Sequence, residues 1–131
     1  MAFVGGYVAT LFAFVAADMI WLRMMLERVY RPAIGGILAT SVNLPAAIVF
    51  YLIFPVGLTI FAVLPAVRDR SAGQAALFGG LFGFFAYATY DLTNQATVRD
   101  WPTQLTVIDV AGGFALAAFA ATIGYLAAVR F

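Results

Sequence analysis

The sequence predicts an all-α integral membrane protein: a bundle of four antiparallel transmembrane helices in a single domain that covers residues 1–131. Hydrophobic residues make up 65% of the chain and charged residues only 10%, whereas soluble domains carry roughly 25% charged residues. The apolar stretches are separated by short segments rich in Arg, Pro and Gly, and short connections favour antiparallel neighbours. The predicted spans are about residues 2–25, 44–67, 72–95 and 103–129.

The first span, about residues 2–25, is long enough to cross a bilayer, which takes about 20 apolar residues. It contains one charge, Asp18, and ends at Trp21 and Arg23, residue types that favour the membrane interface. The connector that follows, residues 26–40, carries further arginines, a proline and a glycine pair. We therefore expect this connector to break the helix and to form a loop in contact with water or lipid headgroups.

The second span, about residues 44–67, follows Asn43, a residue type that caps helices through its side chain. Pro55 lies in the middle of this span and removes one backbone hydrogen bond of the helix. We therefore predict a kink between Tyr51 and Pro55.

The third and fourth spans, about residues 72–95 and 103–129, contain many glycines and alanines. Gly79 and Gly83 have the small-xxx-small spacing that lets the backbones of two membrane helices approach closely. Pro102 precedes the fourth span, as is typical of a helix start. These features predict close packing between neighbouring helices.

Three aspartates are predicted to lie at one depth in the membrane. Asp18 and Asp91 come shortly before the ends of the first and third spans, and Asp109 follows the start of the fourth. All three therefore lie on the order of 5 to 10 Å inside the far face, meaning the face opposite to that of residues 2 and 129. Because charges avoid lipid, these side chains should face inward, around one polar pocket open to the far face.

Other polar side chains share this layer or the same helix stripes, and we consider all of them candidates for ligand binding or proton relay. The full candidate set is Asp18, Asp91, Asp109, Asn94, Tyr87, Tyr90, Thr93, Thr106, Asn43 and Arg23. Carboxylates that meet cannot all be charged without a cation, which an arginine or a hard metal ion such as Mg²⁺, Ca²⁺ or Mn²⁺ can supply. Asp91, Asp109 and Asp18 are the candidate metal ligands.

A purely structural role for each acid remains an alternative. Asp91 can act as a hydrogen-bonded clamp between the third and fourth spans. Asp109 lies near a helix start, where the helix dipole favours an anion. Asp18 can lie shallow enough to reach headgroup water.

The composition excludes several classes of site. The chain has no Cys and no His, which excludes thiolate metal sites and haem ligation by His. All seven basic residues are Arg, so a retinal Schiff base on Lys cannot form. A net charge of +1 without a basic patch gives no indication of nucleic-acid binding.

The segment Ala86-Tyr-Ala-Thr-Tyr-Asp-Leu-Thr-Asn94, with Asp18-Met-Ile-Trp-Leu22 before it and Thr106 and Asp109 after it, resembles a bacterial family of small predicted membrane proteins. That family is known as a domain of unknown function, and Tyr-Asp-Leu-Thr-Asn is the most specific part of the likeness. The resemblance covers nearly the whole chain. It implies a four-helix protein of the bacterial inner (cytoplasmic) membrane, and it implies no activity.

Three functions are compatible with these features. The first is a ligand-binding protein or accessory subunit of a larger membrane complex, and the second is a proton- or cation-coupled transporter that acts as an oligomer. The third is a lipid-modifying membrane enzyme, which the absence of His and Cys disfavours. The lipid bilayer is the expected partner in each case, together with a homo-oligomer or a larger complex. Similar numbers of arginines on the two faces leave the orientation open.

Overall fold

The computed structural model describes all residues, 1–131, and contains helices but no strands. Four helical segments are long and apolar enough to cross a membrane. These segments are Ala2–Ile37, Leu44–Asp69, Ala72–Thr97 and Thr103–Ala128. The predicted bundle of four membrane-spanning helices is therefore confirmed, and the predicted starts of all four helices agree with the structure.

The first segment is longer than predicted, because the connector is helical. Helix α1 (Ala2–Met25) continues as a π-helical turn, Leu26–Tyr30, and then as the short helix α2 (Arg31–Ile34). A 3₁₀ turn, Gly35–Ile37, ends it. The expectation of a loop is thus wrong for most of the connector, because helical hydrogen bonds continue through the π turn and α2 as far as Ile37.

The second segment is irregular at a different place from the one predicted. Helix α3 (Leu44–Leu58) remains α-helical through Pro55, and a π-helical turn, Thr59–Val63, then leads into α4 (Leu64–Asp69). The irregular backbone of this span is thus a π turn after Pro55, and the kink between Tyr51 and Pro55 stays a prediction. Thr59 Oγ1 donates a hydrogen bond to the carbonyl of Pro55 at 2.7 Å, which stabilises the backbone between the two irregular positions.

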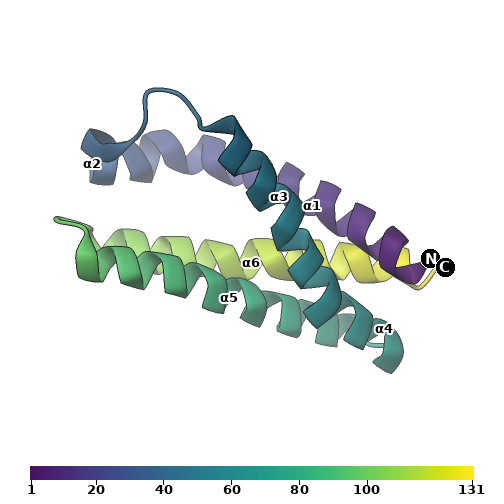
Figure 1. Ribbon diagram of the computed structural model, residues 1–131. Coiled ribbons are helices and arrows are strands. Elements are labelled where there is room, and N and C mark those ends of the chain that lie inside the picture. The colour runs from purple at the N-terminus through teal and green to yellow at the C-terminus, as the bar shows by residue number, and fades with distance from the viewer.

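Helices α5 (Ala72–Thr97) and α6 (Thr103–Ala128) pack against each other along their length, and α1 packs on the other side of α6. A side chain at Gly83 would place its Cβ 2.5 Å from the Cβ of Ala117, which shows how closely the α5 and α6 backbones approach. Small residues permit this contact, as the spacing of the glycines predicts. In Figure 1 the two helices lie side by side, with α1 behind α3.

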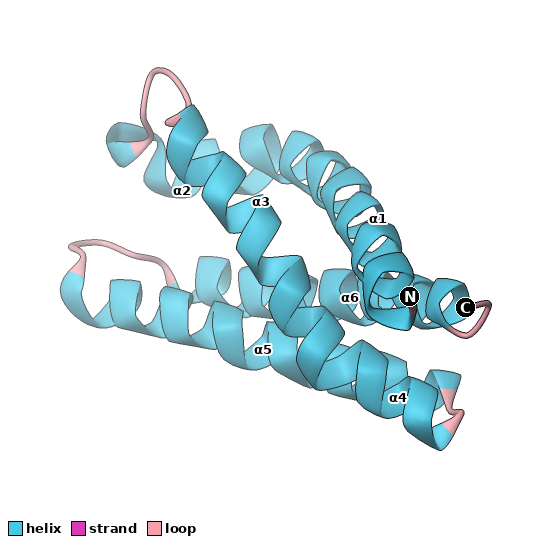
Figure 2. Ribbon diagram, turned by 45° about the vertical axis from the view of Figure 1, so that its right-hand side comes forward, coloured by secondary structure: helices cyan, strands magenta, loops and turns pink.

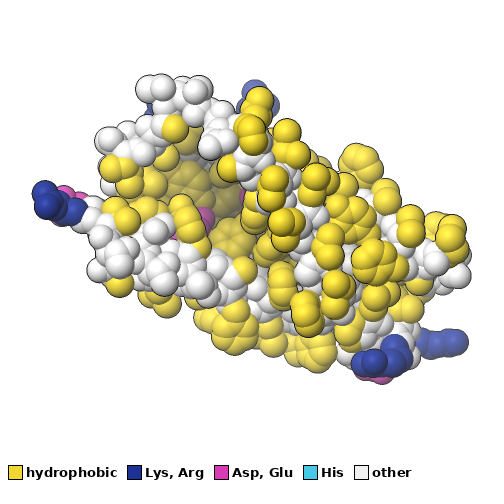
Figure 3. All heavy atoms as spheres, in the orientation of Figure 1, with side chains coloured by type: hydrophobic (Ala, Val, Ile, Leu, Met, Phe, Trp, Pro, Cys, Tyr) yellow, Lys and Arg dark blue, Asp and Glu magenta, His cyan; other side chains and the backbone are white.

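Helix α3 crosses the bundle obliquely. It meets α5 mainly through the π turn and α4, and its amino-terminal half diverges from α5 in both ribbon views (Figures 1 and 2). Arginine side chains gather at the two ends of the molecule, whereas the surface between them is mostly apolar (Figure 3). This distribution fits a bilayer around the middle of the bundle.

Candidate functional site

Asp18 of α1 is buried, with 5% of its surface exposed. Tyr51 of α3 donates a hydrogen bond from its hydroxyl to Asp18 Oδ2. This contact joins the first two spans, and it gives the buried carboxylate a donor, which a charged group needs inside a membrane protein. Asp18 is therefore buried between α1 and α3 and faces the interior of the bundle.

Asp109 of α6 is the end of a hydrogen-bonded chain that begins on α1. Trp21 Nε1 donates to the hydroxyl of Tyr30 at 3.1 Å, and that hydroxyl donates to Asp109 Oδ1 at 2.6 Å. Tyr30 lies in the π turn of the connector, so its hydroxyl bridges residues 79 positions apart in the sequence. The connector is thereby fixed over the far-face end of the bundle.

Asp91 of α5 differs from the other two acids. It has no exposed surface, and neither of its carboxylate oxygens has a hydrogen-bond partner. Its side chain lies beside that of Asp109, within hydrogen-bonding reach if one of the two carboxyl groups carries a proton. Asp91 can therefore link α5 to α6 only when it shares a proton with Asp109, because no N–H or hydroxyl group donates to it.

The three aspartates lie in the wall of one cavity of about 510 Å³, which we call the acidic cavity. Its volume falls within the range of small-molecule sites, about 300 to 1,000 Å³. Aromatic residues from the first three spans and from the connection before α6 contribute most of the remaining wall. They are Trp21, Tyr30, Phe50, Tyr51, Phe54, Tyr87, Tyr90 and Trp101.

The adjacent glycines Gly112 and Gly113 of α6 make room for two of these rings. A Cβ at Gly112 would overlap the ring of Trp21, and one at Gly113 would lie 2.5 Å from Cδ1 of Tyr87. The glycine pair therefore seats two aromatic rings of the cavity wall directly on the α6 backbone.

The acidic cavity opens on the flank of the bundle. Figure 3 shows a hollow on this flank with acidic side chains inside it, and Figure 1 places it between α3 and α5. We expected a pocket open to the far face. The opening lies on the side instead, because α3 diverges from α5 while the connector covers the end.

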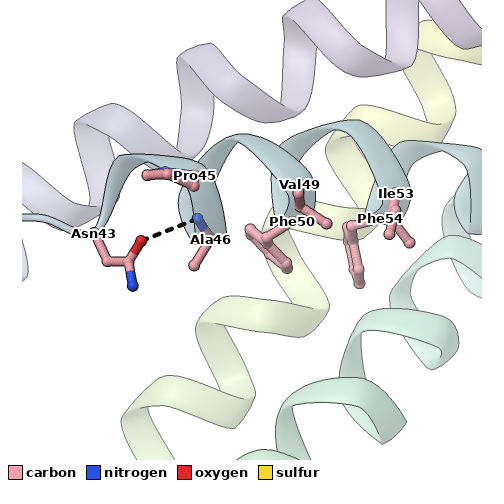
Figure 4. Close-up of a pocket in the computed structure, with 7 residues that line it drawn as sticks. All are labelled: Asn43, Pro45, Ala46, Val49, Phe50, Ile53 and Phe54. Carbon is pink, nitrogen blue, oxygen red and sulfur yellow. Dashed lines mark hydrogen bonds between the residues drawn. The ribbon is translucent and has the colours of Figure 1, made fainter.

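An apolar groove lies along α3 beside this cavity. We call it the α3 groove, and it is lined by Asn43, Pro45, Ala46, Val49, Phe50, Ile53 and Phe54. In Figure 4 the side chains of Val49, Phe50, Ile53 and Phe54 lie along one side of the helix. Phe50 and Phe54 also line the acidic cavity, so the two spaces adjoin at these two rings.

The candidates predicted from the sequence separate into two groups. Tyr87 and Tyr90 line the acidic cavity together with the three aspartates. The remaining polar candidates, which lie outside it, are Asn94, Thr93, Thr106, Asn43 and Arg23.

The candidates outside the cavity have other contacts. Thr106 accepts a hydrogen bond from Trp101 Nε1 at 3.1 Å and donates to Gln95 at 2.8 Å. Thr93 is exposed and donates to carbonyls of its own helix. Asn43 caps α3 by accepting from the backbone N–H of Ala46 at 3.2 Å. Asn94 is half-buried and Arg23 is exposed.

Tyr30 and Tyr51 are absent from the predicted set, although they supply the donors for two of the acids. The sequence could have indicated Tyr51 as a candidate, because it is the first residue with a hydroxyl group after the start of α3, in an otherwise apolar stretch. No comparable signal existed for Tyr30, since it lies among charged residues in the connector.

The three aspartates share the cavity wall but do not form a metal-binding group. No cluster of three or more acidic side chains is close enough together to hold a metal ion. No arginine pairs with them either, because the two ion pairs of the structure are Glu27 with Arg31 and Arg68 with Asp69. The geometry thus favours single carboxylates as hydrogen-bond acceptors and negative charges over a shared metal centre.

Four spanning helices around a polar cavity define a multi-pass membrane protein, which would sit in a lipid bilayer. The chain belongs to the family described as "Predicted membrane protein (DUF2177)", which matches residues 3–126. No curated protein and no solved structure matches it.

Proposed function

We propose that this protein binds a small amphipathic molecule, which reaches the acidic cavity from the bilayer through the opening between α3 and α5. The observation that carries the proposal is Asp91, a buried carboxylate without a hydrogen-bond donor in the wall of that cavity. A buried polar group without a partner lowers stability by about 1 to 3 kcal/mol, so it is retained where it serves a function.

The position of the opening supports access from lipid rather than from water. The connector covers the far-face end through the Tyr30–Asp109 hydrogen bond, and the hollow lies on the apolar flank. A molecule that arrives there meets the apolar α3 groove first and the carboxylates behind it. This sequence of surfaces suits a ligand with an apolar part and a polar head.

Filling the acidic cavity with a large side chain is expected to remove a ligand that copurifies with the protein. Ala47 of α3 lines the cavity, so Ala47→Trp would occupy it, whereas Ile48→Trp adds the same ring to an exposed position outside both spaces. Organic extracts of the purified proteins are compared by mass spectrometry. We expect one amphipathic compound in the extracts of wild type and Ile48→Trp. The amount of this compound in the extract of Ala47→Trp should be at least about tenfold lower.

Identical extracts from Ala47→Trp and Ile48→Trp would contradict the proposal. Size-exclusion profiles and thermal unfolding of both variants establish that each is folded before the extracts are compared. A compound lost from both variants to the same extent also counts against the cavity as its site.

A proton- or cation-coupled carrier is the second candidate function. The adjacent carboxyl groups of Asp91 and Asp109 favour it, because a proton and a cationic ligand would compete for the same oxygens. Release of protons when a cation binds, measured with a pH dye in sealed vesicles, supports this function. Binding without proton release contradicts it.

We further propose that the membrane is the bacterial inner membrane and that the protein acts as a homo-oligomer or as an accessory subunit of a larger complex. The resemblance of the Tyr90–Asn94 segment supports the location. Isolation of the protein in native membrane fragments tests the assembly, and a monomer without partners would contradict it.

A further inference from the structure

The negative charges of the acidic cavity have no positive counterpart within the chain. All seven arginines are exposed, and the chain has no Lys or His. The ion pairs that do form, Glu27 with Arg31 and Arg68 with Asp69, use acids outside the cavity. The buried aspartates therefore need either protons or a cation that comes from outside the protein.

The rest of the cavity wall is suited to an organic cation. Trp21, Tyr87 and Trp101 are among the aromatic residues that line it. The face of an aromatic ring attracts a cation, and the attraction grows when the site excludes water. A wall of rings and carboxylates without basic groups therefore selects against anions and favours positively charged molecules that tolerate an apolar setting.

The hydrogen-bond donors that the carboxylates lack indicate which class of organic cation the site can bind. Both oxygens of Asp91 lack a donor, while Asp109 already accepts one hydrogen bond from Tyr30. Asp109 keeps 7% of its surface exposed and Asp91 none, so Asp109 is reached first from the cavity. A primary ammonium group offers several N–H donors to such a pair of carboxylates, whereas a quaternary ammonium group offers none.

The α3 groove indicates the chemical nature of the apolar part of the ligand. It adjoins the acidic cavity at Phe50 and Phe54, and its other lining residues include Val49 and Ile53. An alkyl chain is the occupant that fits, since it would replace lipid along this apolar surface while its head reaches the carboxylates.

We infer that the ligand is a primary alkylammonium amphiphile, with its ammonium group at Asp109 and Asp91 and its alkyl chain along the α3 groove. This inference rests on the proposed function and specifies the class of molecule that the cavity takes. Four observations support it together: Asp91 without a partner, the absence of a cation from the chain's cavity wall, the aromatic wall and the adjoining groove.

The tryptophans provide a direct test, because the chain has only two and both line the acidic cavity. The protein in phosphatidylcholine nanodiscs is titrated at neutral pH with dodecylamine. At this pH its amine is protonated, as the amine of a lysine side chain is. Tryptophan fluorescence is followed. We expect a saturable change, with dodecanol and dodecyltrimethylammonium at least about tenfold weaker.

Three variants complete the test. Asp91→Asn and Asp109→Asn should each weaken dodecylammonium binding by about tenfold or more. The matched control is Asp69→Asn, which removes an exposed aspartate outside the cavity and should bind as wild type does. Thermal unfolding of each variant shows that it is folded.

The outcomes separate this inference from the proposed function. Equal binding of dodecanol and dodecylammonium, or wild-type affinity in both cavity variants, overturns the ammonium assignment. The proposed function would still stand in that case if Ala47→Trp lost the copurifying compound. Identical extracts from Ala47→Trp and Ile48→Trp overturn the proposed function itself, whatever the titration shows.

Discussion

Asp91→Asn is expected to stabilise the protein while it weakens ligand binding. The wild-type carboxylate is fully buried and has no donor, whereas the amide of Asn has N–H groups that can donate to the neighbouring Asp109. Satisfying a buried polar group in this way contributes about 1 to 3 kcal/mol. We therefore expect a higher midpoint of thermal unfolding for Asp91→Asn in nanodiscs without added amphiphile.

The matched control is Asp18→Asn, which changes an aspartate of the same cavity that already accepts a hydrogen bond from Tyr51. This substitution should give no such gain, because its new N–H groups replace a charge that was already partnered. A lower unfolding midpoint for Asp91→Asn, or equal gains in both variants, would show that Asp91 is not the unsatisfied group of the folded protein.

Tyr30→Phe is expected to release the connector from the bundle. The hydroxyl of Tyr30 accepts from Trp21 and donates to Asp109, so its removal takes a partner from a partly buried indole N–H and from a buried carboxylate. Hydrogen bonds to charged groups contribute about 1.5 to 3 kcal/mol. We expect faster amide hydrogen exchange in residues 26–37, together with a loss of stability in this range.

Tyr7→Phe provides the comparison for Tyr30→Phe. Tyr7 also joins two spans through a single hydrogen bond, from its hydroxyl to the carbonyl of Leu52 at 3.1 Å, but it lies outside the acidic cavity. Exchange in the connector should match wild type in Tyr7→Phe. Unchanged exchange in Tyr30→Phe would mean that the connector is held by contacts other than this hydrogen bond.

The variants Asp91→Asn and Tyr30→Phe test buried aspartates of one cavity that differ in their hydrogen bonding. Asp18 and Asp109 have donors from tyrosines, and these hydrogen bonds hold three spans and the connector together. Asp91 has none, and the protein keeps it at the expense of stability. Groups that lower the stability of a fold in this way are typical of functional positions.

The helices of this protein were predictable because membrane spans depend on length and hydrophobicity, both of which the sequence displays directly. Counting residues from each helix end placed Asp18, Asp91 and Asp109 in one layer, since the rise of an α-helix is constant. In the structure all three lie in the wall of the acidic cavity. Depth alone did not determine their distances, which is why a shared metal site was considered and no such cluster forms.

The connector and the irregular turns were not predictable in the same way. Pro32 and the glycines after it indicated a loop, but a π turn carries the helix through Tyr30 and brings its hydroxyl to Asp109. This contact depends on tertiary packing between residues far apart in sequence. The role of Gly112 was also hidden, because its lack of a side chain matters only once the ring of Trp21 lies against it.

The most direct measurement is photolabelling with a dodecylamine that carries a diazirine at the end of its chain, followed by mass spectrometry of the labelled residues. If the ammonium group lies at Asp109 and Asp91, the chain end should label the α3 groove, at Val49 and Ile53. Ala47→Trp should abolish this labelling. Labelling spread equally over other exposed apolar residues, such as Phe85 and Phe119, would contradict a cavity that takes its ligand from the bilayer.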